Sequence, residues 1–140
     1  MDSYAFVVET EPKGRDIRHL QHCLYEYNAE QTGFRDGKSL AIFLRDASGS
    51  MAAGLYGWTW AGCLKVNDLW VREDERRRGL GSKLLKAAEN EARARGCMRA
   101  VLDTHSFQAP SFYQKRGYSV VGVVEDFPPG HRTYTLFKSL

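Results

Sequence analysis

The chain has 140 residues, of which 43% are hydrophobic and 26% charged, and its formal net charge is +3. This size and balance predict one globular domain over residues 1–140 and argue against a disordered chain. No apolar run approaches the roughly 20 residues that cross a bilayer, and no basic start of a signal peptide is present. We therefore expect no membrane partner. The three cysteines form no CxxC pair, which favours a reducing, cytoplasmic location.

Metal and nucleic-acid partners are not expected either. The histidines show no spacing typical of metal ligands. A net charge of +3 is too mild to indicate a polyanion partner by itself. The sequence also contains no helix-turn-helix, zinc-finger or RRM pattern, so a nucleic-acid-binding module using the local arginines is only a minor alternative.

The first half of the chain predicts strands around one helix. Aromatic and β-branched residues over 4–10 predict a first strand. Apolar residues three and four apart predict an amphipathic helix from Asp16 to about Thr32. Residues 40–44 and 52–60 predict a hairpin, and residues 64–71 predict a fourth strand after a tight turn.

The second half predicts a crossover and a closing hairpin. A charged loop over 72–78 precedes a long helix over about 79–95, which has a leucine and alanine stripe and ends at Gly96. A fifth strand is expected at 100–103, a short helix at 108–116, and two last strands at 118–124 and 133–138. This order predicts an α+β fold with a mixed sheet and one βαβ crossover.

The junction between the fourth strand and the long helix carries the strongest chemical signal. A helix N-terminus offers unpaired N–H groups and a partial positive charge. Gly79 and Gly81 allow an anion to approach the backbone, and three arginines precede them, namely Arg76, Arg77 and Arg78. Residues 76–82 therefore predict a phosphate or pyrophosphate site. The alternative is a plain helix start beside solvated arginines.

The spacing separates the possible phosphate ligands. A Walker A loop is excluded because Gly81-Ser82-Lys83 lacks the required Gly-Lys-Ser/Thr order. A dinucleotide site finds some support in Gly79-Leu80-Gly81 and in Asp103 further along the chain. Leu84 stands where the third glycine is needed, however, and a charged loop separates the strand from the turn, so we rank this interpretation low.

Two segments resemble the GNAT superfamily of acyl-CoA-dependent N-acyltransferases. Arg76-Arg77-Arg78-Gly79-Leu80-Gly81 matches the family signature [Q/R]-x-x-G-x-[G/A] after a hydrophobic strand. The segment from Ser111 to Tyr118 is similar to the family's FYxKxGF segment. The order of elements agrees over essentially the whole chain. The resemblance implies a sheet of about seven strands, splayed between the fourth and fifth, with helices on both faces.

The resemblance also implies acetyl-CoA as the cosubstrate. Its pyrophosphate would lie on the loop amides and its pantetheine arm beside the fourth strand, where an amide could stabilise the oxyanion. Ser106 stands where the family often has an asparagine that contacts the cofactor. The implied cofactor-binding residues are Leu69, Trp70, Val71, Arg76, Arg77, Arg78, Gly79, Leu80, Gly81, Ser82 and Ser106.

Two residues are candidates for proton transfer. By resemblance, Tyr113 is the acid that protonates the departing CoA thiolate; the alternative is an ordinary half-buried aromatic. A protonated amine cannot attack a thioester, so a base is expected as well. Asp68 lies in an otherwise apolar strand, where desolvation would raise the pKa of its carboxyl. It could equally cap a loop or pair with an arginine, and His105 is a weaker candidate.

The acceptor predicted by the resemblance is a primary amine of a small molecule or peptide. Aromatic side chains beside acids suit a cationic amine. The candidate substrate-binding residues are Glu26, Trp58, Trp60, Asp126 and His131. A non-catalytic acyl-CoA-binding regulatory domain remains the alternative function, and a homodimer is left open.

Overall fold

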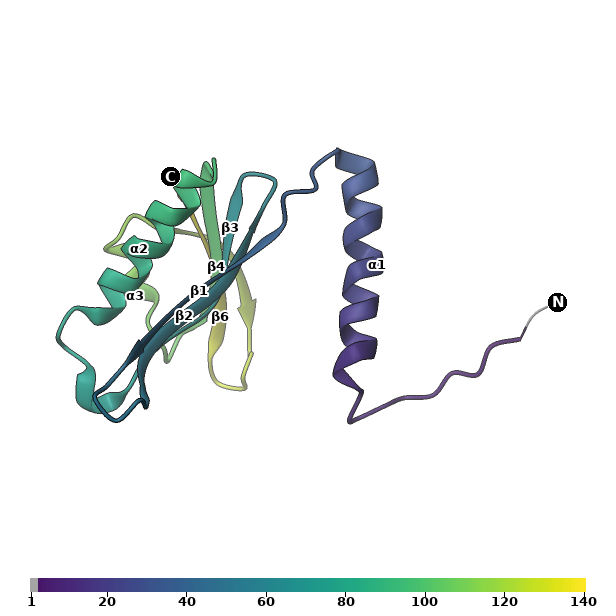
Figure 1. The fold of residues 1–140 in the computed structure, drawn as a ribbon. Helices are drawn as coiled ribbons and strands as arrows, with labels where there is room; N and C mark the ends of the chain where they lie inside the picture. Colours follow the sequence, from purple (N-terminus) through teal and green to yellow (C-terminus); the bar gives the residue numbers. More distant parts are fainter. Residues whose placement is uncertain (1–2) are drawn as a thin grey trace. The chain divides into compact units, whose positions relative to one another are not determined.

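The computed structural model describes residues 3–140 and divides the chain into two compact units, one ending at Arg35 and the other comprising Asp36–Leu140. The second unit holds the whole sheet and the helices that follow it in the chain (Figure 1). Both sequence segments that resemble the GNAT superfamily lie in this second unit.

Within residues 3–35, the described part of the first unit, there is one helix and no strand. Helix α1 (Gly14–Thr32) matches the prediction, and it ends where Gly33 takes a left-handed φ of 78° and donates its N–H to the carbonyl of Ala29. The strand predicted at residues 4–10 is wrong. This segment pairs with no strand, and Tyr4 and Phe6 are exposed. β-propensity alone does not make a strand, because a strand needs a partner whose backbone it can pair with.

The second unit is built on a mixed sheet of six strands. They are β1 (Lys38–Arg45), β2 (Met51–Trp60), β3 (Cys63–Val71), β4 (Arg99–His105), β5 (Ser119–Glu125) and β6 (Arg132–Ser139). Their order is β1-β2-β3-β4-β6-β5, and only β3 and β4 are parallel. The predicted α+β class and single crossover are therefore confirmed. The count is six rather than seven because residues 4–10 form no strand.

Helix α2 (Leu80–Ala94) makes the parallel crossover and covers one face of the sheet (Figure 1). Its Leu84, Leu85 and Ala88 are buried against residues of the strands, such as Leu55 and Leu64. The short 3₁₀ helix η1 (Glu73–Glu75) interrupts the charged loop, and α3 (Pro110–Gln114) is shorter than predicted. Helices α2 and α3 share one core, since Tyr113 of α3 belongs to it.

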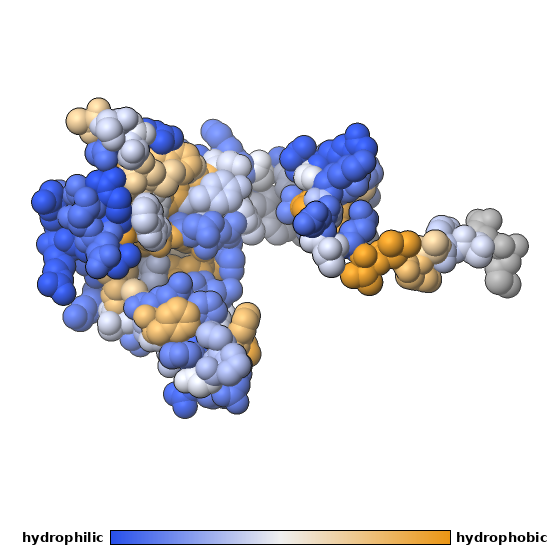
Figure 2. Space-filling view, turned by 90° about the horizontal axis from the view of Figure 1, so that it is seen from below, coloured by the Kyte–Doolittle hydropathy of each residue, from blue (hydrophilic) through white to orange (hydrophobic). Residues whose placement is uncertain are grey.

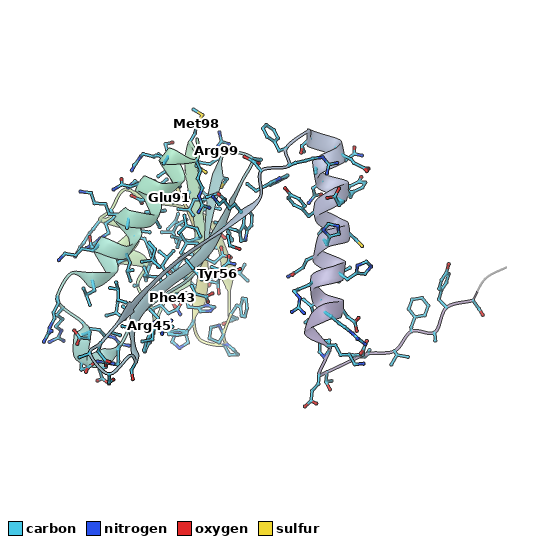
Figure 3. All side chains as sticks on the ribbon, in the orientation of Figure 1. Phe43, Arg45, Tyr56, Glu91, Met98 and Arg99 are labelled. Carbon is cyan, nitrogen blue, oxygen red and sulfur yellow. The ribbon has the colours of Figure 1, made fainter. Side chains whose placement is uncertain are left out.

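The opposite face of the sheet carries large aromatic side chains. Residues of β2 alternate, so that Leu55 and Thr59 are buried whereas Tyr56 and Trp58 are exposed. Phe43 of the neighbouring strand β1 is exposed as well, and Figure 3 labels it together with Tyr56. Trp58 and Trp60 therefore lie on one side of β2, as their spacing predicted, and that side is not the one that packs on α2.

Candidate active site

Strands β3 and β4 separate halfway along their length. They pair only from Cys63 opposite Arg99 to Val66 opposite Leu102. At this point β3 has a bulge: Gly57 of β2 pairs with Val66 and Tyr56 pairs with Asp68, which leaves Asn67 without a partner. A bulge bends its strand. The side of β3 that faces β4 is therefore unpaired over Leu69–Val71, and the predicted splay is confirmed.

Gly57 is required where the bulge begins. A Cβ atom at this position would overlap the carbonyl oxygen of Lys65 on the neighbouring strand. The backbones of β2 and β3 can approach this closely only because residue 57 has no side chain. The close approach holds β3 against β2 just before β3 leaves β4.

The loop that follows β3 presents a row of free backbone donors; we call residues 76–82 the phosphate loop. Arg77 and Gly79 both adopt left-handed conformations, with φ of 66° and 75°. Among the described residues, no backbone acceptor is found for the N–H groups of residues 77–82. The N–H of Lys83 is the first to donate, to the carbonyl of Gly79 at 3.1 Å. Such a turn at a helix N-terminus can hold a phosphate or diphosphate.

The arginines of the phosphate loop have different roles. Arg76 donates from Nε to the carbonyl of Val71 at 2.9 Å and so caps the end of β3. Arg78 pairs with Glu75 at 3.1 Å. Arg77 makes no ion pair with any described residue. Figure 2 shows a mostly hydrophilic surface at this end of the second unit. The loop therefore offers both backbone donors and positive charge to an anion.

Arg72 anchors the segment that leads from β3 into the phosphate loop. Its guanidinium pairs with Asp46 of the β1–β2 turn at 2.8 Å and with Asp74 at 2.6 Å. The hydroxyl of Ser48 and the Arg72 guanidinium hold the pKa of the Asp46 carboxyl well below its usual range. Arg72 thereby ties the loop to the turn between β1 and β2. Sequence reasoning missed this pair, because 26 positions separate the two residues.

Two neighbouring tyrosines differ in what their hydroxyls do. Tyr113 is 8% exposed, and its ring centroid lies 5.8 Å from that of Tyr118. Tyr118 donates its hydroxyl to Glu89 at 2.7 Å, whereas the hydroxyl of Tyr113 has no hydrogen-bond partner among the described residues. Burial raises the pKa of Tyr113 to about 12. Tyr113 is therefore protonated at neutral pH, and its hydroxyl can donate a hydrogen bond to a ligand.

Helix α3, the end of β3 and the phosphate loop meet at Gly81. A Cβ atom there would lie 3.4 Å from the ring of Phe112 and 3.7 Å from the Val71 side chain. Phe112 directly precedes Tyr113 in α3. The fold therefore brings together the signature glycine, the splayed strand and the tyrosine-bearing helix, which are far apart in the sequence.

The structure does not bury Asp68. Its side chain is exposed next to the bulge, so the desolvation expected from the apolar strand is absent. Glu26 lies in the first unit, where it pairs with Arg35 at 2.7 Å. His105 accepts or donates a hydrogen bond at 2.7 Å from Nδ1 to the hydroxyl of Thr133, and its ring stacks on Phe107.

Three predicted residues share one cavity of about 350 Å³ in the second unit, namely Ser106, Asp126 and His131. The cavity lies where β4 ends and the β5–β6 hairpin turns. Its other lining residues are Glu125, Gly130, Arg132 and Tyr134. Ser106 accepts the N–H of Arg132 at 3.0 Å, which ties the end of β4 to the hairpin. Ser106 thus groups with candidate substrate residues rather than with the phosphate loop.

Among residues 3–140, no group of three histidine, cysteine, aspartate or glutamate side chains is placed to hold a metal ion. Within the same range no helix is long and apolar enough to cross a membrane. Cys23, Cys63 and Cys97 are all free thiols.

Comparison with known proteins gives the family. The sequence model of the acetyltransferase (GNAT) family matches residues 6–118, which is most of the chain. The chain belongs to the GNAT family. This family of acetyltransferases uses acetyl-CoA, and the free donors of the phosphate loop fit its diphosphate.

Relatives support the same assignment. The chain is 43% identical to blasticidin-S acetyltransferase of Streptomyces morookaense over 66% of its length and 68% of the relative. It is 40% identical to acetyltransferase Atu2258 of Agrobacterium fabrum over 95% and 97% of the two chains. A crystal structure of a candidate acetyltransferase from Agrobacterium tumefaciens superposes with a TM-score of 0.88 at 33% identity, covering 98% of this chain and 100% of that one.

A more distant solved structure contains acetyl coenzyme A. A candidate streptothricin acetyltransferase from Bacillus anthracis, in complex with acetyl coenzyme A, has a TM-score of 0.63 over 73% of this chain and 62% of that one. At 16% identity, the likeness shows a shared fold.

Proposed function

We propose that this protein transfers the acetyl group of acetyl-CoA to a primary amine of a small molecule or peptide. In this proposal the whole chain acts as one N-acetyltransferase domain in the cytoplasm. The observation that carries it is the row of unpaired N–H groups in the phosphate loop, at the end of the strand that leaves β4. An anion with an extended arm fits both features, since the loop receives the diphosphate and the splay receives the arm.

The residues around the splay supply the chemistry. An unpaired N–H of Leu69–Val71 stabilises negative charge on the thioester oxygen while the amine nitrogen attacks the carbonyl carbon. The C–N bond forms and the C–S bond breaks. Tyr113 gives its phenolic proton to the departing sulfur, and the amine releases a proton to Asp68 or to water. The free hydroxyl and raised pKa of Tyr113 support this assignment.

The cavity at the β5–β6 hairpin is the proposed acceptor site. Glu125 is neutralised by Arg132 at 2.8 Å, whereas Asp126 makes no ion pair with any described residue. Asp126 therefore offers a negative charge to a cationic acceptor. The rings of His131 and Tyr134 line the same cavity, which gives the site aromatic surface. The name of the Streptomyces relative makes blasticidin S the first acceptor to test.

Binding of acetyl-CoA is tested by thermal unfolding. At a concentration of about 100 times Kd, acetyl-CoA should add roughly 2.7 kcal/mol to the free energy of unfolding, and NAD should add nothing. Gly79→Glu should abolish the shift, because a carboxylate would occupy the phosphate loop. Gly62→Glu is the matched control, since Gly62 also has a left-handed φ, of 81°, and open space around its Cβ position. A shift with NAD alone would support a dinucleotide site instead.

Turnover separates an enzyme from a regulatory acyl-CoA-binding domain. Release of the CoA thiol is followed with a panel of amines that begins with blasticidin S and includes polyamines and lysine peptides. A member of the panel should give turnover that Asp126→Asn weakens mainly through KM of the amine. Binding of acetyl-CoA without turnover of any amine would favour the regulatory domain.

The proposed base rests on the position of Asp68 beside the splayed edge of β3. Asp68→Asn should lower kcat/KM, while the affinity for acetyl-CoA stays the same. If kcat/KM of a stable variant is unchanged, Asp68 is not the base and water or His105 takes its place.

A further inference from the structure

The hydrogen bonds around His105 fix which of its two ring nitrogens carries the proton. The Thr133 hydroxyl donates to the carbonyl of Phe127 at 2.8 Å, and a carbonyl oxygen only accepts. This bond uses the single proton of the hydroxyl. The 2.7 Å contact between the Thr133 hydroxyl and Nδ1 of His105 therefore has Nδ1 as its donor. In the neutral ring, Nε2 then has a free lone pair.

Nε2 of His105 is available to a ligand. It makes no hydrogen bond with any described residue, and the side chain is only half-buried. The ring is held in place by stacking on Phe107, with centroids 5.3 Å apart, and by an edge contact with Phe127 at 5.6 Å. The lone pair is thus presented in a fixed direction before any ligand arrives.

The neighbours of β4 set that direction. Strand β4 lies between β3 and β6, and Thr133 of β6 is paired opposite His105. Because Nδ1 is turned to Thr133, Nε2, on the far side of the ring, is turned away from β6. His105 is three residues past Leu102, the last residue of β4 that pairs with β3. Leu69 is likewise three residues past Val66, so His105 and Leu69 lie at a similar height on either side of the splay.

His105 and Asp68 lie on the same face of the sheet. Along β4, Leu102 and Thr104 are buried on the side of α2, so His105 faces the other way. Along β3, Leu69 packs against the core that includes α2, so the preceding Asp68 also faces away from α2. On this face the splay is therefore bordered by a carboxylate from one strand and an imidazole from the other.

We propose that Nε2 of His105 accepts a hydrogen bond from the attacking amine and that Thr133 is the positioning residue that keeps Nε2 unprotonated. This inference rests on the proposed function. One N–H of the amine faces Asp68 or water, which receives the proton, and His105 holds the other, so that the nitrogen lone pair is directed at the thioester carbon. This arrangement requires a primary amine, because a secondary amine has a single N–H when it attacks. The acceptor cavity adjoins it, since His131 of the cavity contacts Phe107 at 4.9 Å.

The first measurement needs no turnover. An NMR spectrum that correlates imidazole nitrogens with their protons should show His105 protonated on Nδ1, and His105→Phe identifies the signal. Thr133→Val keeps the shape of the side chain but removes the hydroxyl, so the proton should move to Nε2. Thr133→Ser retains the hydroxyl and should retain the Nδ1 form. A parent ring protonated on Nε2 instead would overturn the proposal.

The second measurement follows release of the CoA thiol with blasticidin S, spermidine and lysine amide as acceptors. Thr133→Val and His105→Phe should each lower kcat/KM of the amine by about five- to tenfold, as expected for one neutral hydrogen bond. The Kd of acetyl-CoA should stay the same. Thr133→Ser should remain within about twofold of the parent, because its hydroxyl makes the same bonds.

Thr135→Val is the matched control. Thr135 lies on the same strand and donates to Asp103 at 2.7 Å rather than to a group around His105, so the tautomer and kcat/KM should both be kept. An unchanged kcat/KM in His105→Phe, or a loss in Thr133→Val without a change of tautomer, would refute the inference and leave the proposed function intact. If the parent binds acetyl-CoA but acetylates no acceptor, the proposed function fails together with the inference.

Discussion

Tyr113 and Tyr118 show how neighbouring residues of one type separate into different roles. Both rings lie in the core formed by α2, α3 and the sheet. The hydroxyl of Tyr118 is part of a buried network with Glu89 and Lys138, whereas that of Tyr113 is unengaged. The Tyr118 hydroxyl contributes to stability, whereas the Tyr113 hydroxyl is available for chemistry. The pair therefore allows a catalytic role to be separated from a structural one.

Tyr113→Phe should lower kcat by about 10²–10⁴-fold, because a general acid is lost. The melting temperature and the affinity for acetyl-CoA should change little, since the ring and its packing remain. Tyr118→Phe is the control and should behave in the opposite way. It removes a hydrogen bond to a buried carboxylate, at a cost of roughly 1.5–3 kcal/mol, while the chemical step is kept. Initial rates measure the loss of kcat, and thermal unfolding measures the loss of stability, in both variants. Turnover of Tyr113→Phe within about threefold of the parent would give Tyr113 a structural role.

At the scale of elements, the distinctive feature is the bulge that turns β3 away from β4. It depends on Gly57, Asn67 and the register between β2 and β3 rather than on the signature sequence. A regular ladder would pair Leu69–Val71 and leave no edge for a ligand. The close approach of β2 and β3 at Gly57 and the unpaired edge at Leu69–Val71 therefore both belong to the same bulge.

Gly57→Ala should therefore be strongly destabilising. The added methyl group would overlap the backbone of β3, which cannot rotate away, and such overpacking costs roughly 1–3 kcal/mol or more. Gly54→Ala in the same strand is the control. Its Cβ would lie 3.2 Å from the flexible side chain of Phe43, so a smaller loss is expected. Denaturant unfolding of the two variants measures the difference. Equal losses would show that the approach at Gly57 is not tight in solution.

At the scale of the molecule, ion pairs join the segment between β3 and the phosphate loop to the β1–β2 turn. Arg72 connects Asp46, in the β1–β2 turn, with Asp74, in the loop after β3. The pKa values of both carboxyls are held below their usual range, for Asp46 first by Ser48 and then by Arg72, and for Asp74 by Arg72. The network thus couples the stability of the fold to pH.

The sign of this coupling follows from linkage. A carboxyl whose pKa is lower in the folded state stabilises the fold above its unfolded value, near 3.8, and this contribution is lost as pH falls further. The unfolding free energy of the parent should therefore fall between about pH 5 and pH 3 more steeply than that of Asp46→Asn. Urea unfolding at several pH values measures both slopes. Asp126→Asn, which removes a carboxylate that forms no ion pair with any described residue, is the control for the loss of one negative charge. Identical slopes for the parent and Asp46→Asn would contradict the prediction.

Local patterns were enough to predict most elements of the fold. The stripe of α2, its glycine start and the alternation in β2 are properties of neighbouring residues, and the structure has them as predicted. The segment 4–10 shows the limit of such patterns, because a strand exists only if another strand pairs with it. The exposure of Asp68 shows a similar limit of local patterns. An apolar strand sequence does not determine which face of the strand is covered by other elements.

The sequence by itself determined the family and the order of the elements from the first helix onward. These depend on residues within a few positions of one another, where helix caps, glycines and side-chain periodicity act directly. Only the tertiary structure decided that Arg72 pairs with Asp46, that Tyr118 rather than Tyr113 is hydrogen-bonded, and that Thr133 lies opposite His105. Each of these joins residues that are distant in the chain, and packing of the whole sheet and its helices sets their distances.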